Sequence, residues 1–397
     1  MHIGIASPIT ISEFFEFLDE QSKELSKGVV GLKAPAVDTV AKELLKQGHT
    51  ISIYTLANEV SDLVILNGDR LKIYIGPFKR KGFFKAITIF NKEAGYIEKS
   101  IRLESKLPDI IHANWTYEFA LGSISFKNKI PIVVTVRDWA PLILQLNKNY
   151  YRFSRLILNN KIFRTPSIFF ISNSPYIQGK IESRWKIKTP VIPNPVNENF
   201  VSTPKIHNDS FSPVLISVSN GLGKLKNIET LLRAFQLVLM DKSDARLRLV
   251  GSPFLPQNAK MKKWDNQGLL KNVELLGTVK HEDLISLYDE ATVMVHPSLE
   301  ESFGNTLIEA MARKVPVIGG MYSGAVPYVL DYGKSGFLCD VTSIESIGES
   351  ILVLLKDQKL RQKLIKNATE RIANKFSSKA ITEQSLKLYS KLIQEAK

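Results

Sequence analysis

Short runs of β-branched and aromatic residues alternate with longer helix-periodic segments along this chain, and the alternation occurs twice. In the first half the strand-sized runs are Ile3–Ala6, Ile51–Tyr54, Asp109–Ala113, Ile130–Val136 and Ile168–Ser172. Between the first two lies Val37–Gln47, whose apolar residues recur at helical spacing. This alternation predicts parallel strands joined by helices that cover both faces of a sheet.

The alternation restarts after a segment rich in proline and polar residues near 192–213. Its predicted strands are Val214–Val218, Arg246–Val250, Val273–Leu276 and Val293–His296, and its predicted helices are Asn227–Leu239 and Leu284–Asp289. A chain of 397 residues is too long for one ordinary core. We therefore predict two Rossmann-like, doubly wound α/β domains, 1–195 and 196–380. An amphipathic helix within 381–397 follows, and packing back on the first domain is one option for it.

The densest pattern of polar and glycine residues spans 296–320, HPSLEESFGNTLIEAMARKVPVIGG. It predicts a strand end, a glycine-containing turn and a helix. We expect Asn305 and Thr306 to cap this helix, with Leu307, Ala310 and Met311 on its buried face. Free N–H groups at a helix N-terminus bind phosphate, and Gly304 would let a diphosphate approach the backbone closely.

Two carboxylates bracket this turn, Glu301 before it and Glu309 one helical turn later. An acid in such a place can accept hydrogen bonds from ribose hydroxyls, as acids do in dinucleotide-binding folds. Each residue taken singly also fits a capped helix that carries exposed acids. The functional interpretation therefore depends on all of these residues together and not on any one of them.

Two glutamates with seven residues between them, which bracket Phe-Gly and are followed by Glu-Ala-Met-Ala and Val-Pro-Val, resemble the donor-site signature of family 4 retaining glycosyltransferases of the GT-B fold. The resemblance implies two domains facing across a cleft and a nucleotide-sugar donor bound to the second. It continues at 217–227, SVSNGLGKLKN, where Lys226 matches a lysine that contacts the donor diphosphate. Asn220 replaces the arginine of many members, and Lys224 is a candidate for the missing charge. Thr278 and Val279 belong to a matching Gly-Thr-Val run, 277–279.

The first half carries weaker matches to the same family. Residues 108–115, PDIIHANW, resemble its Pro-Asp-x-x-His-x-His, with His112 retained and Asn114 in place of the second histidine. Arg137 and Asp138 belong to a Thr-x-Arg-Asp element that faces the cleft in the family. Gly31 ends a glycine-rich loop that matches imperfectly. Tyr328 replaces a usual glutamate after Gly-x-Pro.

The resemblance implies metal-independent, retaining transfer from a UDP- or GDP-sugar to a hydroxyl of a glycan or lipid-linked acceptor, in polysaccharide or glycolipid biosynthesis. Neither a metal nor a cofactor is expected, because a helix N-terminus and a lysine can stabilise the departing diphosphate. The expected catalytic residues are Glu301, Lys226 and His112. The expected donor-binding residues are Glu309, Ser302, Phe303, Gly304, Asn305, Thr306, Asn220, Lys224, Thr278 and Val279. Gly31, Asn114, Arg137 and Asp138 are expected on the acceptor side or in the cleft.

Two other functions are compatible with the residues. An inactive homologue acting as a partner subunit fits the replacements at Asn114, Asn220 and Tyr328. A nucleotide-sugar epimerase would share the fold but needs acids and histidines in the cleft. The sequence identifies neither the donor sugar and base nor the acceptor, the linkage formed or the oligomeric state.

The net charge is +14, and two basic stretches lie in the first half of the chain. Arg70–Lys106 is basic and includes FKRKGFFK at 78–85, and Leu142–Pro190 has nine Lys/Arg and one acid, Glu182. No nucleic-acid-binding signature accompanies this charge. The alternatives are a solvated basic surface or a peripheral contact with anionic membrane. The single cysteine, Cys339, and the absence of a signal-peptide pattern favour a cytoplasmic protein, at most peripheral at the inner face of the cell membrane.

Overall fold

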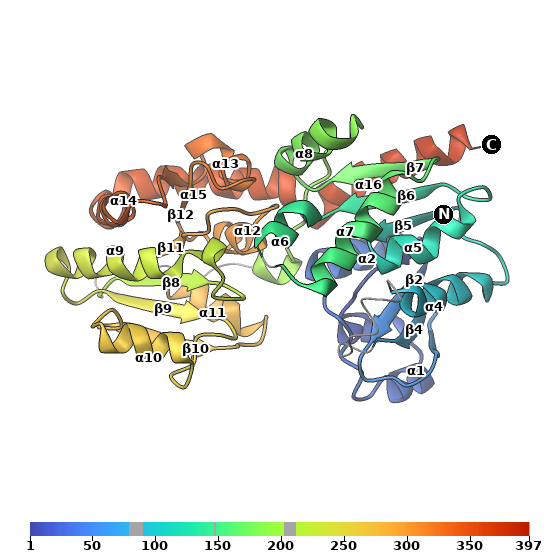
Figure 1. Cartoon of the computed structure of the whole chain (residues 1–397), viewed down its shortest axis with the longest axis horizontal. Helices are drawn as coiled ribbons and strands as arrows, with labels where there is room; N and C mark the ends of the chain where they lie inside the picture. The colour runs from blue at the N-terminus through green and yellow to red at the C-terminus, as the bar shows by residue number, and fades with distance from the viewer. Residues whose placement is uncertain (79–89, 147, 202–211, 397) are drawn as a thin grey trace. The chain divides into compact units, whose positions relative to one another are not determined.

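The computed structural model describes residues 1–78, 90–146, 148–201 and 212–396 (Figure 1). The chain forms two compact units. Unit 1 comprises Met1–Pro195 and Ser378–Lys397, and unit 2 comprises Val196–Ser377. Each unit is built on its own mainly parallel sheet with helices on both faces, which confirms the predicted fold class.

The sheet of unit 1 has seven strands in the order β3-β4-β2-β1-β5-β6-β7. They are β1 (His2–Ala6), β2 (Thr50–Ala57), β3 (Val64–Asn67), β4 (Leu71–Pro77), β5 (Ile110–Asn114), β6 (Ile132–Val136) and β7 (Ile168–Ser172). Only β3 pairs antiparallel, with β4. The described helices are α1 (Glu20–Leu25), α2 (Pro35–Lys46), α4 (Asn91–Arg102), α5 (Glu118–Ser123), α6 (Ala140–Leu146), α7 (Tyr150–Phe163), α8 (Pro175–Trp185) and α16 (Ser378–Glu395).

Alternation along the strands of unit 1 directs apolar side chains to two hydrophobic clusters. In β2, Ile51 and Ile53 join one cluster, and Tyr54 and Leu56 join the other. The first cluster is covered by α2 and α16, and the second by helices that include α4, α5, α7 and α8. The strand sequence changes direction between β1 and β5, the kind of position where open α/β sheets bind ligands beyond the carboxyl ends of their strands.

The sheet of unit 2 has six parallel strands in the order β10-β9-β8-β11-β12-β13. They are β8 (Val214–Val218), β9 (Arg246–Val250), β10 (Val273–Gly277), β11 (Val293–His296), β12 (Val317–Gly320) and β13 (Phe337–Cys339). The described helices are α9 (Ile228–Asp241), α10 (Ala259–Asn266), α11 (Asp283–Asp289), α12 (Asn305–Ala312), α13 (Val326–Val329), α14 (Ile344–Lys356) and α15 (Gln358–Arg371).

Two hydrophobic clusters flank this sheet as well. Val293 and Val295 of β11 face the cluster beneath α9 and α14, whereas Met294 faces the cluster beneath α11 and α12. Both faces of β11 are therefore apolar, and its first polar side chain at the carboxyl end, His296, points toward the loops. Among the helices in the described part of the chain, none combines the length and apolar character that a membrane span needs.

Candidate active site

Three loops leave the carboxyl ends of β8, β11 and β12 in unit 2, and β11 lies between the other two strands. The loop after β8 contains a 3₁₀ turn, Lys224–Lys226, and ends at Asn227. The Asn227 side chain donates hydrogen bonds to the carbonyl oxygens of Pro297 (3.2 Å) and Val341 (2.7 Å). These bonds hold the loop after β8 against the loop after β11.

Glu301 lies where these two loops meet. Its Oε1 is 2.5 Å from Lys226 Nζ and 3.3 Å from His296 Nε2. Burial alone would raise the pKa of Glu301, but His296 and Lys226 outweigh that effect and lower the pKa to about 2. Glu301 is therefore an anion at neutral pH, and it fixes the Lys226 ammonium at the sheet edge.

Helix α12 begins directly after Gly304, whose φ of 97° lies in the left-handed region. A Cβ on Gly304 would lie 2.7 Å from Leu307 Cδ1, and at this φ any side chain would be strained, so the turn favours glycine. The expected cap was wrong: Gly304 occupies the N-cap position, no side chain caps the helix, and Asn305 and Thr306 are its first two residues. The predicted buried face is confirmed for Leu307, Ala310 and Met311.

The backbone of 302–306 and the side chain of Phe303 have different structural roles. Phe303 is buried, and its ring packs edge-on against Phe376 at 5.6 Å, so its side chain belongs to the core. The loop after β12 adds a second backbone contact, because Ala325 N–H donates to the Glu301 carbonyl at 2.9 Å. A Cβ on Gly324 would lie 2.4 Å from that oxygen, so this close approach requires glycine.

Glu309 lies on α12, and its carboxylate has two protein partners. Oε1 is 3.1 Å from His281 Nε2, and Oε2 accepts from the Tyr288 hydroxyl at 3.4 Å. Burial and the adjacent carboxylate raise the pKa of Tyr288 well above its ordinary value, so this hydroxyl keeps its proton and donates. Thr278 and Val279 follow β10 and lie just before His281 in the chain; Thr278 is exposed, and Val279 packs against the core.

Asn220 and Tyr328 depart from the family pattern in unit 2, and their environments differ. Asn220 and Lys224 are exposed at the loop after β8. Tyr328 instead packs with Arg371, whose guanidinium lies 5.4 Å from the centre of the tyrosine ring. Arg371 also donates to Asp331 Oδ1 at 3.0 Å. Where the family usually has a glutamate, this chain therefore has a tyrosine in a cation–π contact with Arg371.

In unit 1, His112 lies on β5 and both ring nitrogens are engaged. Nδ1 lies 2.5 Å from the Tyr389 hydroxyl of α16, and Nε2 lies 2.6 Å from Thr135 Oγ1. Burial, with a contribution from the charge of Arg137, lowers the pKa of His112 to about 3, so the ring is neutral. These contacts tie β5 to β6 and α16, and the expected chemical role of His112 stays a prediction.

Asn114 and Arg137 lie together at the carboxyl ends of β5 and β6. Arg137 Nε donates to Asn114 Oδ1 at 2.9 Å, and Nη1 donates to Asn194 Oδ1 at 2.5 Å. Asp138 points elsewhere and accepts from the Tyr117 hydroxyl at 2.8 Å. Burial raises the pKa of Asp138 despite this bond and the nearby Arg155.

Gly31 lies in the loop before α2 and forms an isolated bridge with Thr10. Its φ is 81°, and a Cβ there would lie 2.4 Å from the Ile9 carbonyl oxygen. The structure gathers only part of the predicted residues, and it does so in two places. In unit 2, Glu301 and Lys226 meet beside the start of α12, and Glu309 lies one turn along it. In unit 1, Asn114 and Arg137 meet.

Several residues at these places were not assigned a role from the sequence. They are the partners of the predicted groups: His296, His281, Tyr288 and Asn194. Asn194 and Arg137 are 57 positions apart, and Glu309 and His281 are 28 apart. Only the place of His296 at the end of a predicted strand could have singled it out.

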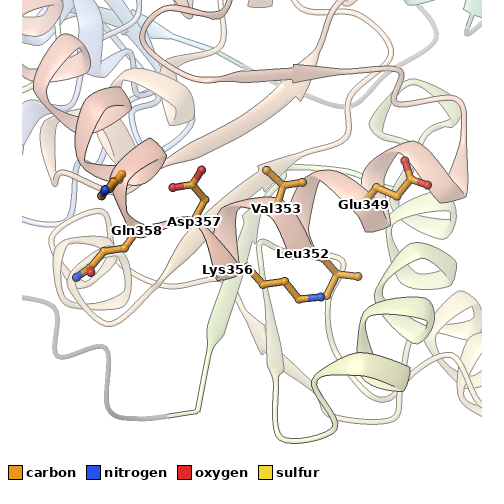
Figure 2. A pocket seen from close by; sticks show the side chains of 7 residues that line it. Glu349, Leu352, Val353, Lys356, Asp357 and Gln358 are labelled. Carbon is orange, nitrogen blue, oxygen red and sulfur yellow. The ribbon is translucent and has the colours of Figure 1, made fainter.

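A surface groove of about 730 Å³ lies elsewhere in unit 2, where α14 meets α15 (Figure 2). Its lining includes the apolar side chains of Leu352 and Val353 and the charged ends of Glu349, Lys356 and Asp357. It shares no lining residue with the Glu301 cluster. The groove is therefore not part of the candidate site.

Two family models match the chain. "Glycosyl transferases group 1" matches residues 203–371, and "Glycosyltransferase Family 4" matches residues 36–200. The two matches are consecutive along the chain. The first contains the Glu301 cluster and α12, and the second contains Asn114 and Arg137.

Curated relatives are similar over part of the chain. The capsular polysaccharide biosynthesis glycosyltransferase CapM of Staphylococcus aureus is 32% identical over 193 residues, which cover 48% of this chain and 49% of CapM. The N-acetyl-alpha-D-glucosaminyl L-malate synthase of Bacillus anthracis is 30% identical over 188 residues, or 46% of this chain and 47% of the synthase. The matches span about half the length of each relative.

Solved structures resemble the whole chain. Sucrose-phosphate synthase from Thermosynechococcus elongatus superposes with a TM-score of 0.77 at 20% identity and covers 100% of both chains. HepE of Anabaena, solved with UDP and glucose, gives a TM-score of 0.70 at 17% identity, with 99% of this chain and 100% of HepE covered. At these identities the likeness concerns the fold, which is that of the GT-B glycosyltransferases.

Proposed function

Because the chain belongs to the group 1 glycosyltransferases of family 4, we propose that it transfers a sugar from a nucleoside-diphosphate sugar to a hydroxyl group, with retention of configuration. The observation that carries this proposal is the Lys226–Glu301–His296 cluster beside the start of α12. A fixed cation and a glycine-started helix lie at one sheet edge, and both stabilise negative charge.

The donor would bind to unit 2. The backbone of 302–306 would hold the diphosphate at the start of α12, with Lys226 and the exposed Lys224 as counter-charges. Glu309 would accept hydrogen bonds from ribose hydroxyls, and His281 and Tyr288 fix its carboxylate for that role. Glu301 would orient sugar hydroxyls. UDP is the first nucleotide to test, because the HepE structure holds UDP, and GDP is the second.

The reaction would need no covalent intermediate on the protein. The acceptor oxygen would bond to the anomeric carbon on the face from which the diphosphate leaves. The bond from that carbon to the diphosphate would break, and a departing phosphate oxygen would take the acceptor proton. Lys226 and the α12 N-terminus would stabilise the charge that develops on the leaving group. Glu301, with its low pKa, would stay ionised throughout and would not act as the acid.

A glycan or a lipid-linked hydroxyl is the proposed acceptor, and CapM, which acts in capsular polysaccharide biosynthesis, supports a polysaccharide or glycolipid pathway. We also propose peripheral contact with an anionic membrane at the inner face of the cell membrane. The support lies on α6 and α7, where Tyr150 is 72% exposed, Phe153 54% and Leu146 44%. These side chains line or adjoin a groove of about 680 Å³ that also includes Lys148.

Binding of nucleotides tests the donor half of the proposal directly. Thermal unfolding of the full chain would be followed with UDP, GDP and ADP, each at a hundred times its dissociation constant. One of the three should add about 2.7 kcal/mol to the free energy of unfolding. An inactive partner subunit or an unrelated function is favoured if none shifts the transition.

A further inference from the structure

Arg137 is a guanidinium for which the described part of unit 1 supplies no carboxylate partner. It follows β6 and is half-buried at the sheet edge. Across the described residues, no acid lies within ion-pairing distance of it. Burial lowers the pKa of Arg137 to about 10, which still leaves it charged at neutral pH. A half-buried charge without a counter-charge is costly, so it requires an explanation.

The hydrogen bonds of Arg137 satisfy one side of the guanidinium. Nε and Nη1 donate to the amide oxygens of Asn114 and Asn194. Nη2 finds no acceptor among the described residues, and it is not among their enclosed, unsatisfied polar atoms. Nη2 is therefore accessible to solvent. Paired with the remaining N–H of Nη1, its N–H groups form the edge that binds a carboxylate or phosphate with two parallel hydrogen bonds.

The residues around Arg137 hold it in place without neutralising it. His112 is neutral because of its low pKa, and Asp138 is bonded to Tyr117. The ring of Trp115 lies 5.6 Å from the guanidinium. Trp115 has a φ of 64°, an unfavourable conformation for a bulky residue. Such strain persists where the surrounding structure enforces it, and it concentrates at binding sites.

The anion would not enter the interior of unit 1. The cavity lined by His112, Asn114 and Arg137 has about 30 Å³, which is room for about one water molecule. A phosphate would instead meet the Nη2 edge from the surface. This edge lies at the carboxyl ends of β5 and β6, next to the change of direction in the strand order.

We propose that Arg137 binds a phosphate or carboxylate group of the acceptor, so that the acceptor is an anionic alcohol or sugar. This inference rests on the proposed function, because it assigns a substrate to unit 1 of a glycosyltransferase. Asn114 and Asn194 position the guanidinium, and the anion supplies the missing counter-charge. An arginine suits this role better than lysine, since only the planar fork gives two parallel bonds.

The test compares glycerol 3-phosphate, glycerate and glycerol in nucleotide-free titrations of the full chain followed by calorimetry. We expect at least one of the two anions to bind and glycerol not to bind, and the two anions separate phosphate from carboxylate recognition. Arg137→Gln should weaken anion binding at least tenfold, and Arg137→Lys should weaken it less. Arg152→Gln, which removes a cation on α7, is the matched control and should leave binding unchanged.

Two readouts distinguish a binding arginine from a structural one. Removing an uncompensated charge should leave the Tm of Arg137→Gln equal to or above that of the wild type, and UDP binding should be unchanged. A lowered Tm with unaltered anion affinity overturns the proposal. So does displacement of the anion by saturating UDP, which would assign the anion site to the donor. If the wild type binds no nucleotide, that result counts against the proposed function. The anion titrations contain no nucleotide, so their outcome is independent of donor binding.

Discussion

In the proposed mechanism, Glu301 positions Lys226 and does not take part in proton transfer. Its side chain is largely buried, which favours the neutral form, yet it lies 2.5 Å from the Lys226 ammonium and 3.3 Å from the His296 ring. These neighbours keep it charged, and it in turn keeps Lys226 at the edge of the sheet. A cation held in advance costs less to bring to a leaving group than a flexible one.

The depressed pKa of Glu301 predicts how stability responds to acid. A pKa of about 2 in the folded chain, against about 4.5 unfolded, contributes about 3 kcal/mol. This contribution is fully present above the unfolded pKa and is lost as the pH falls toward the folded pKa. Glu301→Gln lacks it at every pH. The Tm difference between wild type and variant should therefore shrink between about pH 5 and pH 3, and a constant difference would contradict the pairing.

A second prediction concerns the proposed contact between Glu309 and the ribose. Glu309→Ala should weaken binding of the nucleoside diphosphate by about 1.5–3 kcal/mol, because the ribose loses a charged acceptor. The matched control is Glu282→Ala, which removes an exposed acid next to His281 in the chain. Titration calorimetry with UDP would measure both. An unchanged dissociation constant for Glu309→Ala would remove Glu309 from the donor site.

The start of helix α12 is where the donor phosphates are proposed to bind. Together with Lys226 it would supply positive potential at the leaving diphosphate, so the proposed mechanism needs no metal ion. We expect turnover to persist in excess EDTA. If EDTA abolishes turnover and Mg²⁺ or Mn²⁺ restores it, the leaving group depends on a metal and this account of α12 is wrong.

Helix α7 supports the prediction of membrane contact. Tyr150→Ser with Phe153→Ser should reduce cosedimentation with anionic vesicles, and binding should fall at high salt because each nearby Lys or Arg contributes about 1 kcal/mol that salt screens. Met240→Ser is the matched control, since Met240 is 84% exposed on α9 of unit 2. Equal binding by all three proteins would leave α7 as a solvated face.

The other basic segment predicted to contact membrane includes Lys79, Arg80, Lys81 and Lys85, which lie outside the described residues. Replacing all four by serine should also reduce vesicle binding while leaving donor hydrolysis intact. If this variant sediments with anionic vesicles as the wild type does, these lysines and arginine belong to a solvated surface. That result would leave α7 as the remaining candidate for contact.

The strands were predictable from sequence because their signal is local. The predicted Ile168–Ser172, Val214–Val218, Arg246–Val250 and Val293–His296 match β7, β8, β9 and β11 residue for residue. The helix cap at α12 was not predictable in the same way, since Asn305 and Thr306 are good caps and only the backbone conformation of Gly304 decides the start. The partners of Glu309 and Arg137 come from distant parts of the chain and depend on the tertiary fold.

At the scale of the whole molecule, the chain leaves unit 1 after Pro195, completes unit 2 and returns at Ser378 to add α16 to unit 1. Tyr389 of α16 reaches His112 on β5, so the last helix contributes to the same core as the first strands. In the proposed function, the two units bind different substrates. Unit 2 would bind the donor, and unit 1 the acceptor.

The central claim is that this chain uses a nucleotide sugar as its donor, and release of nucleoside diphosphate tests it most directly. The full chain would be incubated with UDP-, GDP- and ADP-sugars, and the free diphosphate measured against Lys226→Ala. We predict release from one donor class by the wild type, with at least a tenfold slower rate in the variant because the leaving group loses its fixed cation. No release from any donor, or equal release by both proteins, would contradict the account.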